Sequence, residues 1–375
     1  MSILRLSIVV FSLLFPTLTL SAPNLSDKLA LINLPPGFEI TLYAENVENA
    51  RQLALGDNGT VFAGSTRAGK VHAIVDSDGD HSTDSVYLID EDLKLPSGIA
   101  FRNGSLYVAA LEQILRYDNI ETQLEQPPEP QIFHDGFPDK THHGWKYLRF
   151  GPDDYLYVPV GAPCNICDEA GFAELRRISL KDNTEEVFAR GLRNSVGLAF
   201  HPDTGELWLT DNGRDRLGED VPADELNHVP AGGLHFGYPW CHQGDILDPE
   251  YGEGKSCDDY TAPAQKLGAH VAALGLTFYN GEQFPRNYHK QLFIAQHGSW
   301  NRTEKTGYSI LLVRFDKSGT ALGTEVFASG WLQGDEAWGR PNDILQMPDG
   351  ALLVSDDKAN AIYRISYNKT LASDK

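Results

Sequence analysis

Cationic residues are few in this 375-residue sequence, and no run of Lys or Arg occurs in it. It has 31 Lys and Arg residues against 52 Asp and Glu residues, which gives a formal net charge of −21 at pH 7. Binding to DNA or RNA depends on a basic surface that neutralises phosphate charges. The sequence therefore argues against a nucleic acid as the partner.

Long hydrophobic runs are confined to the first 22 residues. There, Arg5 precedes an apolar stretch over 6–20 and two small residues, which predicts a secretory signal peptide at 1–22. The alternative is an uncleaved membrane anchor, but the stretch is shorter than a span needs and Pro16 interrupts it. We therefore expect an exported protein, periplasmic or secreted, with no membrane span in the mature chain.

Cysteine is scarce, and an even number of cysteines in an oxidising compartment favours disulfides. Pairing Cys164 with Cys167 and Cys241 with Cys257 is the simplest of the three possible connectivities. The CxxC could instead bind haem or act in redox chemistry. However, Asp168 stands where c-type haem attachment needs His, and a thioredoxin-like βαβ context is absent. The CxxC is therefore expected to be a structural clip.

The sequence has no strong amphipathic helical segment, but one strand pattern recurs six times. Each copy has an alternating apolar run, a turn of Gly, Pro, Asp or Asn, and a second apolar run. Further strand-like runs follow, for example at 70–75, 113–117, 310–315 and 362–367. The six copies lie at 53–63, 99–108, 148–158, 198–209, 276–294 and 344–354.

These repeats predict the fold class. One hairpin sheet cannot bury both of its faces, so neighbouring units must stack around an axis. We therefore expect an all-β protein, a six-bladed β-propeller with four-stranded antiparallel blades that forms a single domain over 23–375. Residues 38–44 alternate like a strand and are expected to complete the last blade. Two β-sandwiches with similar turns are the alternative.

A propeller carries its functional groups on the loops at one end of the central channel. Polar residues just before an inner strand, or just after a strand end, are therefore the candidates for a site. Four clusters satisfy this test: 141–146, 191–197, 211–214 with 224–227, and 297–302 with 339–343.

These clusters contain the motifs HHGWKYLRFGPD, GLRNSVGLAFHPDTGELWLTDNG, DELN, AQHGSWNR and GRPND. In this order and spacing they resemble the soluble glucose/sorbosone dehydrogenase family, most closely its L-sorbosone dehydrogenase-like and aldose sugar dehydrogenase-like members. The resemblance covers about 34–367. It implies a six-bladed quinoprotein that uses pyrroloquinoline quinone (PQQ) and Ca²⁺ to oxidise a sugar or sugar-derived aldehyde to a lactone or acid.

The resemblance also implies partners. Two electrons would pass to an external acceptor, a quinone or a cytochrome. The sequence has no CxxCH motif, so that acceptor is not a fused cytochrome. We expect a monomer or a homodimer.

PQQ carries three carboxylates beside an ortho-quinone, so its site needs fixed cations and hydrogen-bond donors. The resemblance and the residue chemistry together indicate Arg193, Asn194, Arg302, Arg340 and Asn342 as cofactor-binding residues.

The resemblance implies that Ca²⁺ is held partly by main-chain carbonyls at a step that here is Gly213-Arg214. The family has Pro at the second position of this step. Arg214 takes its place here and would add a cation beside the metal. Asp224 and Glu225 could bind a second, structural Ca²⁺ or tie down their loop. The acidic segment 76–84 resembles a calcium loop, but it is equally consistent with a solvated hairpin tip.

His143 aligns with the catalytic His of the family and is the predicted general base, with His142 as the adjacent alternative. In the glucose-oxidising branch a carboxylate orients this His. Ala162 occupies the equivalent point here, so another group must orient the base, and Asp168 is one candidate.

Two other functions compete with the dehydrogenase. One is a Ca²⁺-dependent propeller lactonase or esterase, which would have no use for several arginines at one rim. The other is a non-catalytic propeller that binds glycans.

Overall fold

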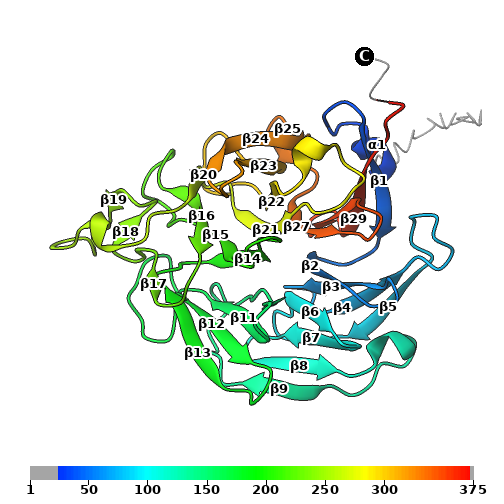
Figure 1. Ribbon diagram of the computed structural model, residues 1–375, viewed down its shortest axis with the longest axis horizontal. Helices are drawn as coiled ribbons and strands as arrows, with labels where there is room; N and C mark the ends of the chain where they lie inside the picture. The colour runs from blue at the N-terminus through cyan, green and yellow to red at the C-terminus, as the bar shows by residue number, and fades with distance from the viewer. Residues whose placement is uncertain (1–23, 372–375) are drawn as a thin grey trace, which may run out of the picture.

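The computed structural model describes residues 24–371, whose strands form six sheets arranged in a ring (Figure 1). Within each blade, the strand nearest the ring centre comes first in the sequence of that blade's hairpin. Each sheet contacts the next around the ring, and the sixth contacts the first. The predicted six-bladed β-propeller is confirmed. The predicted signal peptide lies outside the described residues.

The sheets follow one another along the chain. The first sheet is β2 (Ala50–Leu55), β3 (Val61–Ser65), β4 (Val71–Val75) and β5 (Ser85–Asp90). The second is β6 (Gly98–Arg102), β7 (Ser105–Ala109), β8 (Gln113–Tyr117) and β9 (Gln131–Asp135). The third is β10 (Arg149–Phe150), β11 (Tyr155–Val160), β12 (Glu174–Ser179), β13 (Glu185–Arg190) and β17 (Leu234–His235). The fourth is β14 (Ser195–Phe200), β15 (Leu207–Asp211), β16 (Ala223–Val229) and β20 (Gln265–Ala269).

The fifth sheet is β21 (Ala273–Phe278), β22 (Leu292–Gln296), β23 (Ser309–Phe315) and β24 (Ala321–Ser329). The sixth is β27 (Pro341–Gln346), β28 (Leu352–Asp356), β29 (Ala361–Tyr367) and β1 (Phe38–Glu45). Outside the blades lie α1 (Leu25–Leu29), the pair β18 (Cys241–His242) and β19 (Ile246–Leu247), and the pair β25 (Leu332–Gln333) and β26 (Glu336–Ala337). Short 3₁₀ turns occur at Ile120–Thr122, Cys257–Asp259 and Arg286–Tyr288. Among residues 24–371, no helix is long and apolar enough to cross a membrane.

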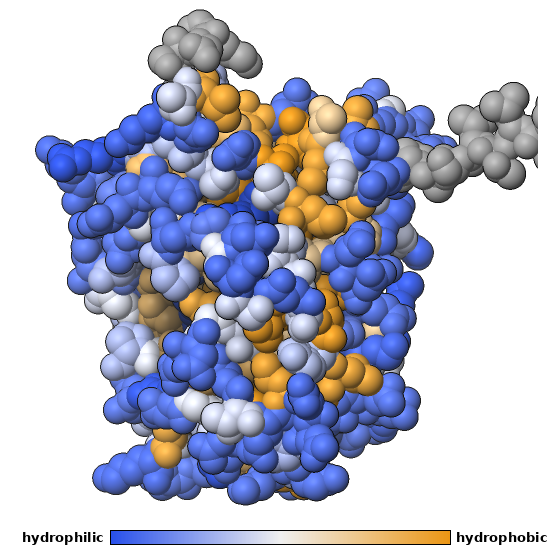
Figure 2. Space-filling view, turned by 90° about the vertical axis from the view of Figure 1, so that its right-hand side faces the viewer, coloured by the Kyte–Doolittle hydropathy of each residue, from blue (hydrophilic) through white to orange (hydrophobic). Residues whose placement is uncertain are grey.

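The position of a strand within its blade determines its burial. All five residues of β3, of β22 and of β28 are buried, because these second strands are covered on both faces by neighbouring sheets. The first four residues of the outer strand β5 instead alternate between partly buried and exposed. The hydrophobic core therefore lies between the blades. Figure 2 shows that the side of the molecule on the right of Figure 1 is mostly hydrophilic, with apolar residues in a broken central band.

The last blade is closed by the first long strand of the chain, as predicted. β1 pairs antiparallel with β29, with Phe38 opposite Tyr367 and Glu45 opposite Ala361. The Phe38 ring lies 4.7 to 5.1 Å from four other aromatic rings, which fixes it in the core. This pairing closes the ring with hydrogen bonds between the two ends of the described chain.

The third blade departs from the predicted four-stranded antiparallel form. The segment after β16 returns to add β17 parallel to β13, with Ala189 opposite Leu234 and Arg190 opposite His235. The long insertion between the fourth and fifth hairpins thus forms β16, β20 and the β18–β19 ribbon as well as this fifth strand. Both predicted disulfides are present: Cys164–Cys167 precedes β12, and Cys241–Cys257 crosses the insertion.

Polar side chains join the innermost strands at the centre of the ring. The Gln52 side-chain oxygen accepts hydrogen bonds from the backbone N–H groups of Ile99 (3.0 Å) and Leu148 (2.9 Å). The Asp343 carboxylate accepts from Leu53 N–H (2.8 Å) and the Tyr147 hydroxyl (3.1 Å). Each of these two side chains therefore links blades that are distant in sequence.

Candidate active site

A cavity of about 600 Å³ opens at one end of the propeller. Most of its lining residues come immediately before a first strand or immediately after a second strand of a blade. In an antiparallel hairpin these two positions lie at the same end, so the fold gathers them around one opening. The volume is in the range of cofactor and small-molecule sites.

The cavity is rich in positive charge although the chain as a whole is strongly acidic. Its cationic lining residues are Arg51, Arg67, Arg193, Arg340 and Lys358. Its acidic lining residues are Asp215, Asp224 and Asp357. Guanidinium groups donate hydrogen bonds in pairs to carboxylates, so this lining suits an anionic ligand.

His143 lies in the cavity wall with its side chain buried. Its Nδ1 is 2.8 Å from the carbonyl oxygen of Ala162. A carbonyl can only accept, so Nδ1 carries the proton and Nε2 keeps its lone pair. Burial, together with the positive charge of Arg193, holds the pKa of His143 well below its ordinary value of 6.5. The imidazole is therefore neutral near pH 7 and can accept a proton.

A close approach of two loops makes this geometry possible. His143 has a left-handed backbone conformation (φ 49°), which is costly for a residue other than glycine. A Cβ atom on Gly161 would lie 2.7 Å from the Cβ of His143, so only glycine fits there. Asp168, proposed from the sequence as the orienting group, lines a separate groove instead. The main-chain carbonyl of Ala162 orients the His.

Asp211, the last residue of β15, positions the turn that carries Arg193 and Asn194. Its carboxylate accepts hydrogen bonds from the N–H groups of Arg193 (2.9 Å) and Asn194 (2.8 Å) and from the hydroxyl of Ser195 (2.9 Å). Burial raises the pKa of Asp211 to about 6, although these hydrogen bonds act in the opposite direction. The Asn194 side-chain oxygen accepts from Trp145 Nε1 (3.0 Å). Both predicted residues line the cavity.

Arg340 reaches the cavity from the start of the sixth blade. Its Nε and Nη2 donate to the carbonyl oxygens of His297 (2.8 Å) and Gly298 (2.5 Å). Beside it, Asp357 accepts from Arg51 Nη1 and His297 Nε2, both at 2.7 Å. Burial alone would raise the pKa of Asp357, but His297 and Arg51 outweigh it and hold that pKa below 3.8. Asp357 is therefore an ionised carboxylate within the cationic wall.

Gly213 and Asp224 lie together on the cavity wall. The Asp224 carboxylate accepts from the N–H groups of Gly213 (3.0 Å) and Ala273 (3.2 Å), which joins the fourth blade to the fifth. Burial raises the pKa of Asp224 to about 6. A carboxylate beside a main-chain segment is a donor set that suits Ca²⁺, which prefers oxygen ligands.

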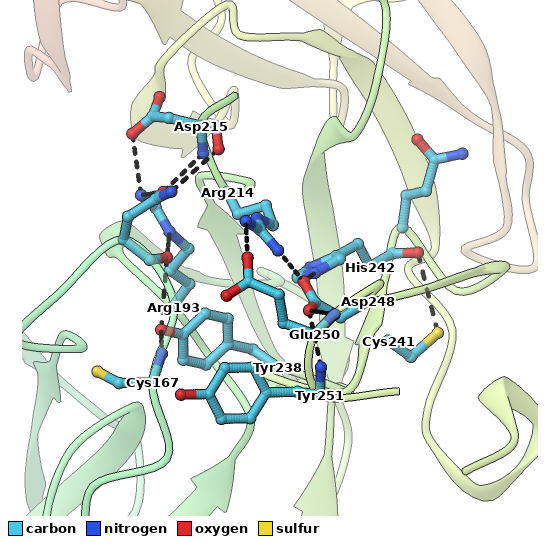
Figure 3. A network of polar contacts seen from close by, with 12 residues as sticks. Cys167, Arg193, Arg214, Asp215, Tyr238, Cys241, His242, Asp248, Glu250 and Tyr251 are labelled. Carbon is cyan, nitrogen blue, oxygen red and sulfur yellow. Dashed lines mark hydrogen bonds and ion pairs between the residues drawn. The ribbon is translucent and has the colours of Figure 1, made fainter. Parts of the chain in front are cut away.

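The Arg214 side chain does not line the cavity but joins a network of polar contacts (Figure 3). Its guanidinium pairs with the carboxylates of Asp248 and Glu250, the latter at 2.9 Å. His242 Nε2 lies 2.8 Å from the same Asp248. These partners balance the charge of Arg214, so it does not place an unpaired cation beside Gly213.

Glu225 lies behind the cavity wall, directly opposite Asp211 in the β15–β16 ladder. Its carboxylate accepts from Gln243 N–H (2.7 Å) and Asn227 Nδ2 (3.0 Å). Burial, and then the charge of Asp211, raise the pKa of Glu225 to about 8. It borders a second, much smaller cavity rather than the main one.

Two predicted cofactor-binding residues do not line the cavity. Arg302 donates from Nη1 to the Glu219 carbonyl (2.6 Å) and pairs with Asp220 (3.0 Å). Asn342 is buried, and with its amide oxygen turned toward Arg51 it accepts from Arg51 Nε at 3.1 Å. It can therefore act on the cavity only through Arg51.

The acidic hairpin 76–84 lies at an exposed tip. The carboxylate oxygens of Asp76, Asp78 and Asp84 are within 4.8 Å of one another. All three side chains accept hydrogen bonds from the loop itself: His81 N–H donates to Asp76 (2.9 Å), Asp80 N–H to Asp78 (3.1 Å) and Ser77 N–H to Asp84 (2.7 Å). This geometry fits both predictions made from the sequence, a calcium loop and a solvated hairpin tip.

A family model described as TrAA12-like matches residues 32–368. The chain belongs to the TrAA12-like family. An uncharacterized protein of Borreliella burgdorferi is 32% identical over 373 residues, which cover 95% of this chain and 95% of that protein.

Solved structures show the same fold as this TrAA12-like chain. A structure of the Trichoderma reesei carbohydrate-active enzyme family AA12 has a TM-score of 0.79 at 20% identity, covering 90% of this chain and 98% of the other. The holo form of the pyranose dehydrogenase PQQ domain from Coprinopsis cinerea has a TM-score of 0.77 at 17% identity, covering 89% and 97%. The resemblance to quinoprotein sugar dehydrogenases, drawn from the motifs, is confirmed at the level of the family.

Several residues that line the cavity of this TrAA12-like protein were not predicted. They are Arg51, Arg67, Asp215, His270 and Asp357. Asp357 comes directly after the second strand β28 and Arg67 two residues after the second strand β3, where the position test already pointed. Applying that test to every blade, rather than only to the blades with recognisable motifs, would have found both. Asp215 and His270 lie within the long insertion, which has no repeat from which their positions in the fold could be predicted.

Proposed function

We propose that this protein is an exported quinoprotein dehydrogenase that uses PQQ and Ca²⁺ to oxidise a sugar or a sugar-derived aldehyde to a lactone or acid. The observation that carries the proposal is the joint lining of one cavity by neutral His143 and by Arg193, Asn194 and Arg340. Membership of the TrAA12-like family supports the proposal. The likeness in fold to the PQQ domain of a pyranose dehydrogenase supports it as well. The two disulfides support an oxidising compartment.

The cavity fits a tricarboxylate. Arg51 and Arg340 come from the neighbouring first and sixth blades and Arg193 comes from the fourth, so positive charge reaches the cavity from two sides. Their guanidinium groups are already fixed by carboxylate or carbonyl partners, which reduces the entropy lost when a ligand binds. Arg67 and Lys358 add positive charge from the same two blades as Arg51 and Arg340. These five residues would hold the cofactor carboxylates.

For Ca²⁺, the main chain at Gly213-Arg214 and the Asp224 carboxylate would supply the oxygen ligands. A second, structural Ca²⁺ would use Glu225, whose carboxylate faces that of Asp211 and would gain most from a neutralising cation.

His143 would act as the general base. When bound, PQQ would supply a two-electron acceptor and Ca²⁺ a Lewis acid. Nε2 of His143 takes the proton of the substrate hydroxyl, while Nδ1–H remains bonded to the Ala162 carbonyl and keeps the ring in place. Arg193 disfavours the resulting imidazolium, which promotes release of the proton to solvent. The electrons then leave to an external quinone or cytochrome.

Reconstitution tests the function directly. Purified apoprotein is mixed with PQQ and CaCl₂, and reduction of a dye is followed with a panel of aldoses and aldehyde sugars. Sugar-dependent dye reduction that needs both additives supports the proposal. Lactone hydrolysis without PQQ would indicate the lactonase, and glycan binding with neither activity would indicate a binding propeller.

Replacing Arg340 by Gln should weaken PQQ binding by at least about tenfold. A hydrogen bond to a charged group contributes roughly 1.5–3 kcal/mol, and about 1.4 kcal/mol corresponds to a factor of ten in affinity. The dissociation constant is measured by fluorescence titration. Arg302→Gln is the matched control, because Arg302 lies outside the cavity and its variant should bind like the wild type. Equal affinities for both variants would remove Arg340 from the cofactor site.

A further inference from the structure

The residue that holds the Arg193 guanidinium lies inside the CxxC clip. Arg193 Nε donates to the main-chain carbonyl of Asn165 (2.9 Å), and Arg193 Nη2 donates to the Asn165 side-chain oxygen (2.9 Å). Asn165 is flanked in sequence by Cys164 and separated by one residue from Cys167, and these two cysteines form a disulfide. The bridge therefore encloses the residue that makes two of the hydrogen bonds of this arginine.

Asn165 and Asp215 form a rigid cradle for the guanidinium. The Asn165 side-chain oxygen accepts from Asp215 N–H (2.8 Å), and its Nδ2 donates to the Asp215 carbonyl (3.0 Å). The Asp215 carboxylate accepts from Arg193 Nη2 (3.1 Å, Figure 3), and Arg193 Nη1 donates to the Asn212 carbonyl (3.2 Å). The Arg193 side chain is only 4% exposed. Its orientation is thus set by the protein before any ligand binds.

Besides the bonds of Asn165 to Arg193 and Asp215, the clip is held at a few further points, one of which is the Tyr238 hydroxyl, which donates to the Asn165 carbonyl (3.5 Å). Residues 161–173 contain no helix or strand, so backbone ladders do not hold this segment. One anchor is Tyr238, whose hydroxyl oxygen accepts from Cys167 N–H (3.1 Å, Figure 3) and lies 3.6 Å from Cys164 Sγ. A second is Ala162, whose N–H donates to the Arg193 carbonyl (2.8 Å). The disulfide is the covalent constraint on the position of Asn165.

We propose that Asn165, enclosed by the Cys164–Cys167 disulfide, is a positioning residue that orients Arg193 and so sets the affinity of the cavity for a polycarboxylate cofactor. This inference rests on the proposed function for the identity of the cofactor, but not for the orientation of Arg193. It follows that opening the disulfide weakens cofactor binding. Reduction of the Cys164–Cys167 disulfide would then lower the affinity of the cavity for its ligand without unfolding the propeller.

The first test replaces Asn165 by Ala. We expect the dissociation constant for PQQ, measured by fluorescence titration in CaCl₂, to rise by roughly tenfold or more, since the variant loses the hydrogen bond from Arg193 Nη2 to the side-chain oxygen and both side-chain bonds to Asp215. Asn287→Ala is the matched control, because Asn287 is exposed and lies outside the cavity. Binding by Asn165→Ala equal to that of the wild type would overturn the proposal.

The second test isolates the disulfide. One variant carries Cys164→Ser with Cys167→Ser, and the control carries Cys241→Ser with Cys257→Ser. We expect the first variant to bind PQQ about as weakly as Asn165→Ala, with no further loss when the two changes are combined, because both act through one cradle. Full additivity of the two changes would contradict the proposal.

A third readout does not need the cofactor. The NMR signal of the Arg193 Nε–H group, assigned by its loss in Arg193→Lys, should shift and exchange faster with solvent in Asn165→Ala apoprotein than in the wild type. If wild-type protein does not bind PQQ, the proposed function fails and this signal alone decides whether Asn165 positions Arg193. An unchanged signal would overturn the positioning role whatever the cofactor is.

Discussion

Replacing His143 by Ala is expected to lower the turnover number for sugar-dependent dye reduction by about 100-fold to 10,000-fold, the range in which general bases contribute. The variant loses the only imidazole that the Ala162 carbonyl holds with Nε2 free toward the cavity. PQQ binding should change little, because the cationic residues that would hold the cofactor remain. Steady-state kinetics with saturating cofactor, together with a fluorescence titration, measure both quantities.

The pH dependence provides an independent check on the same residue. The pKa of His143 is held well below 6.5, so the base stays deprotonated, and kcat/KM should be constant as pH falls from 8 to 6.5 and decline only at lower pH. His142→Ala is the control, since His142 is exposed and lies beside His143. If His142→Ala abolishes turnover and His143→Ala does not, the base has been assigned to the wrong histidine.

Replacing Asp357 by Ala is expected to lower the free energy of unfolding by about 3–5 kcal/mol, because it leaves the buried Arg51 guanidinium without its carboxylate. His297 loses its partner in the same variant. Urea denaturation of the apoprotein measures the difference.

Asp220→Ala serves as the control for this stability prediction. Asp220 is also paired with an arginine, Arg302, but its side chain is 86% exposed, and exposed ion pairs contribute little. The pKa of Asp357 is depressed in the folded state, so its contribution is present above the unfolded value and lost as pH falls below 3.8. The wild type and Asp357→Ala should therefore converge in stability at acid pH. A difference that persists there would point to packing rather than charge as its source.

The fold could be predicted because its repeating unit is local. Each hairpin has an apolar pattern and a turn that can be recognised within about twenty residues, and the strand at 38–45 alternates clearly enough to be placed in the last blade. The parallel strand β17 could not be predicted, because its two residues pair with a blade that lies earlier in the chain. Nothing in a sequence marks such a return.

Residues that line the cavity could be predicted where motif and position agreed, as for His143, Arg193 and Arg340. It was not predicted where a side chain is redirected by partners distant in sequence. Arg302 follows a recognisable motif, yet the loop at 219–220 engages it outside the cavity. The orienting partner of His143 was also hidden, because a main-chain carbonyl leaves no trace in the residue type at position 162.

The pairing of β1 with β29 has a consequence for how the molecule is made. Phe38 and Tyr367 are separated by almost the entire described sequence, so the final blade cannot assemble until β29 has left the ribosome. Until then β1 presents an open edge and unburied aromatic rings to other chains. Slow synthesis should therefore favour aggregation through this strand.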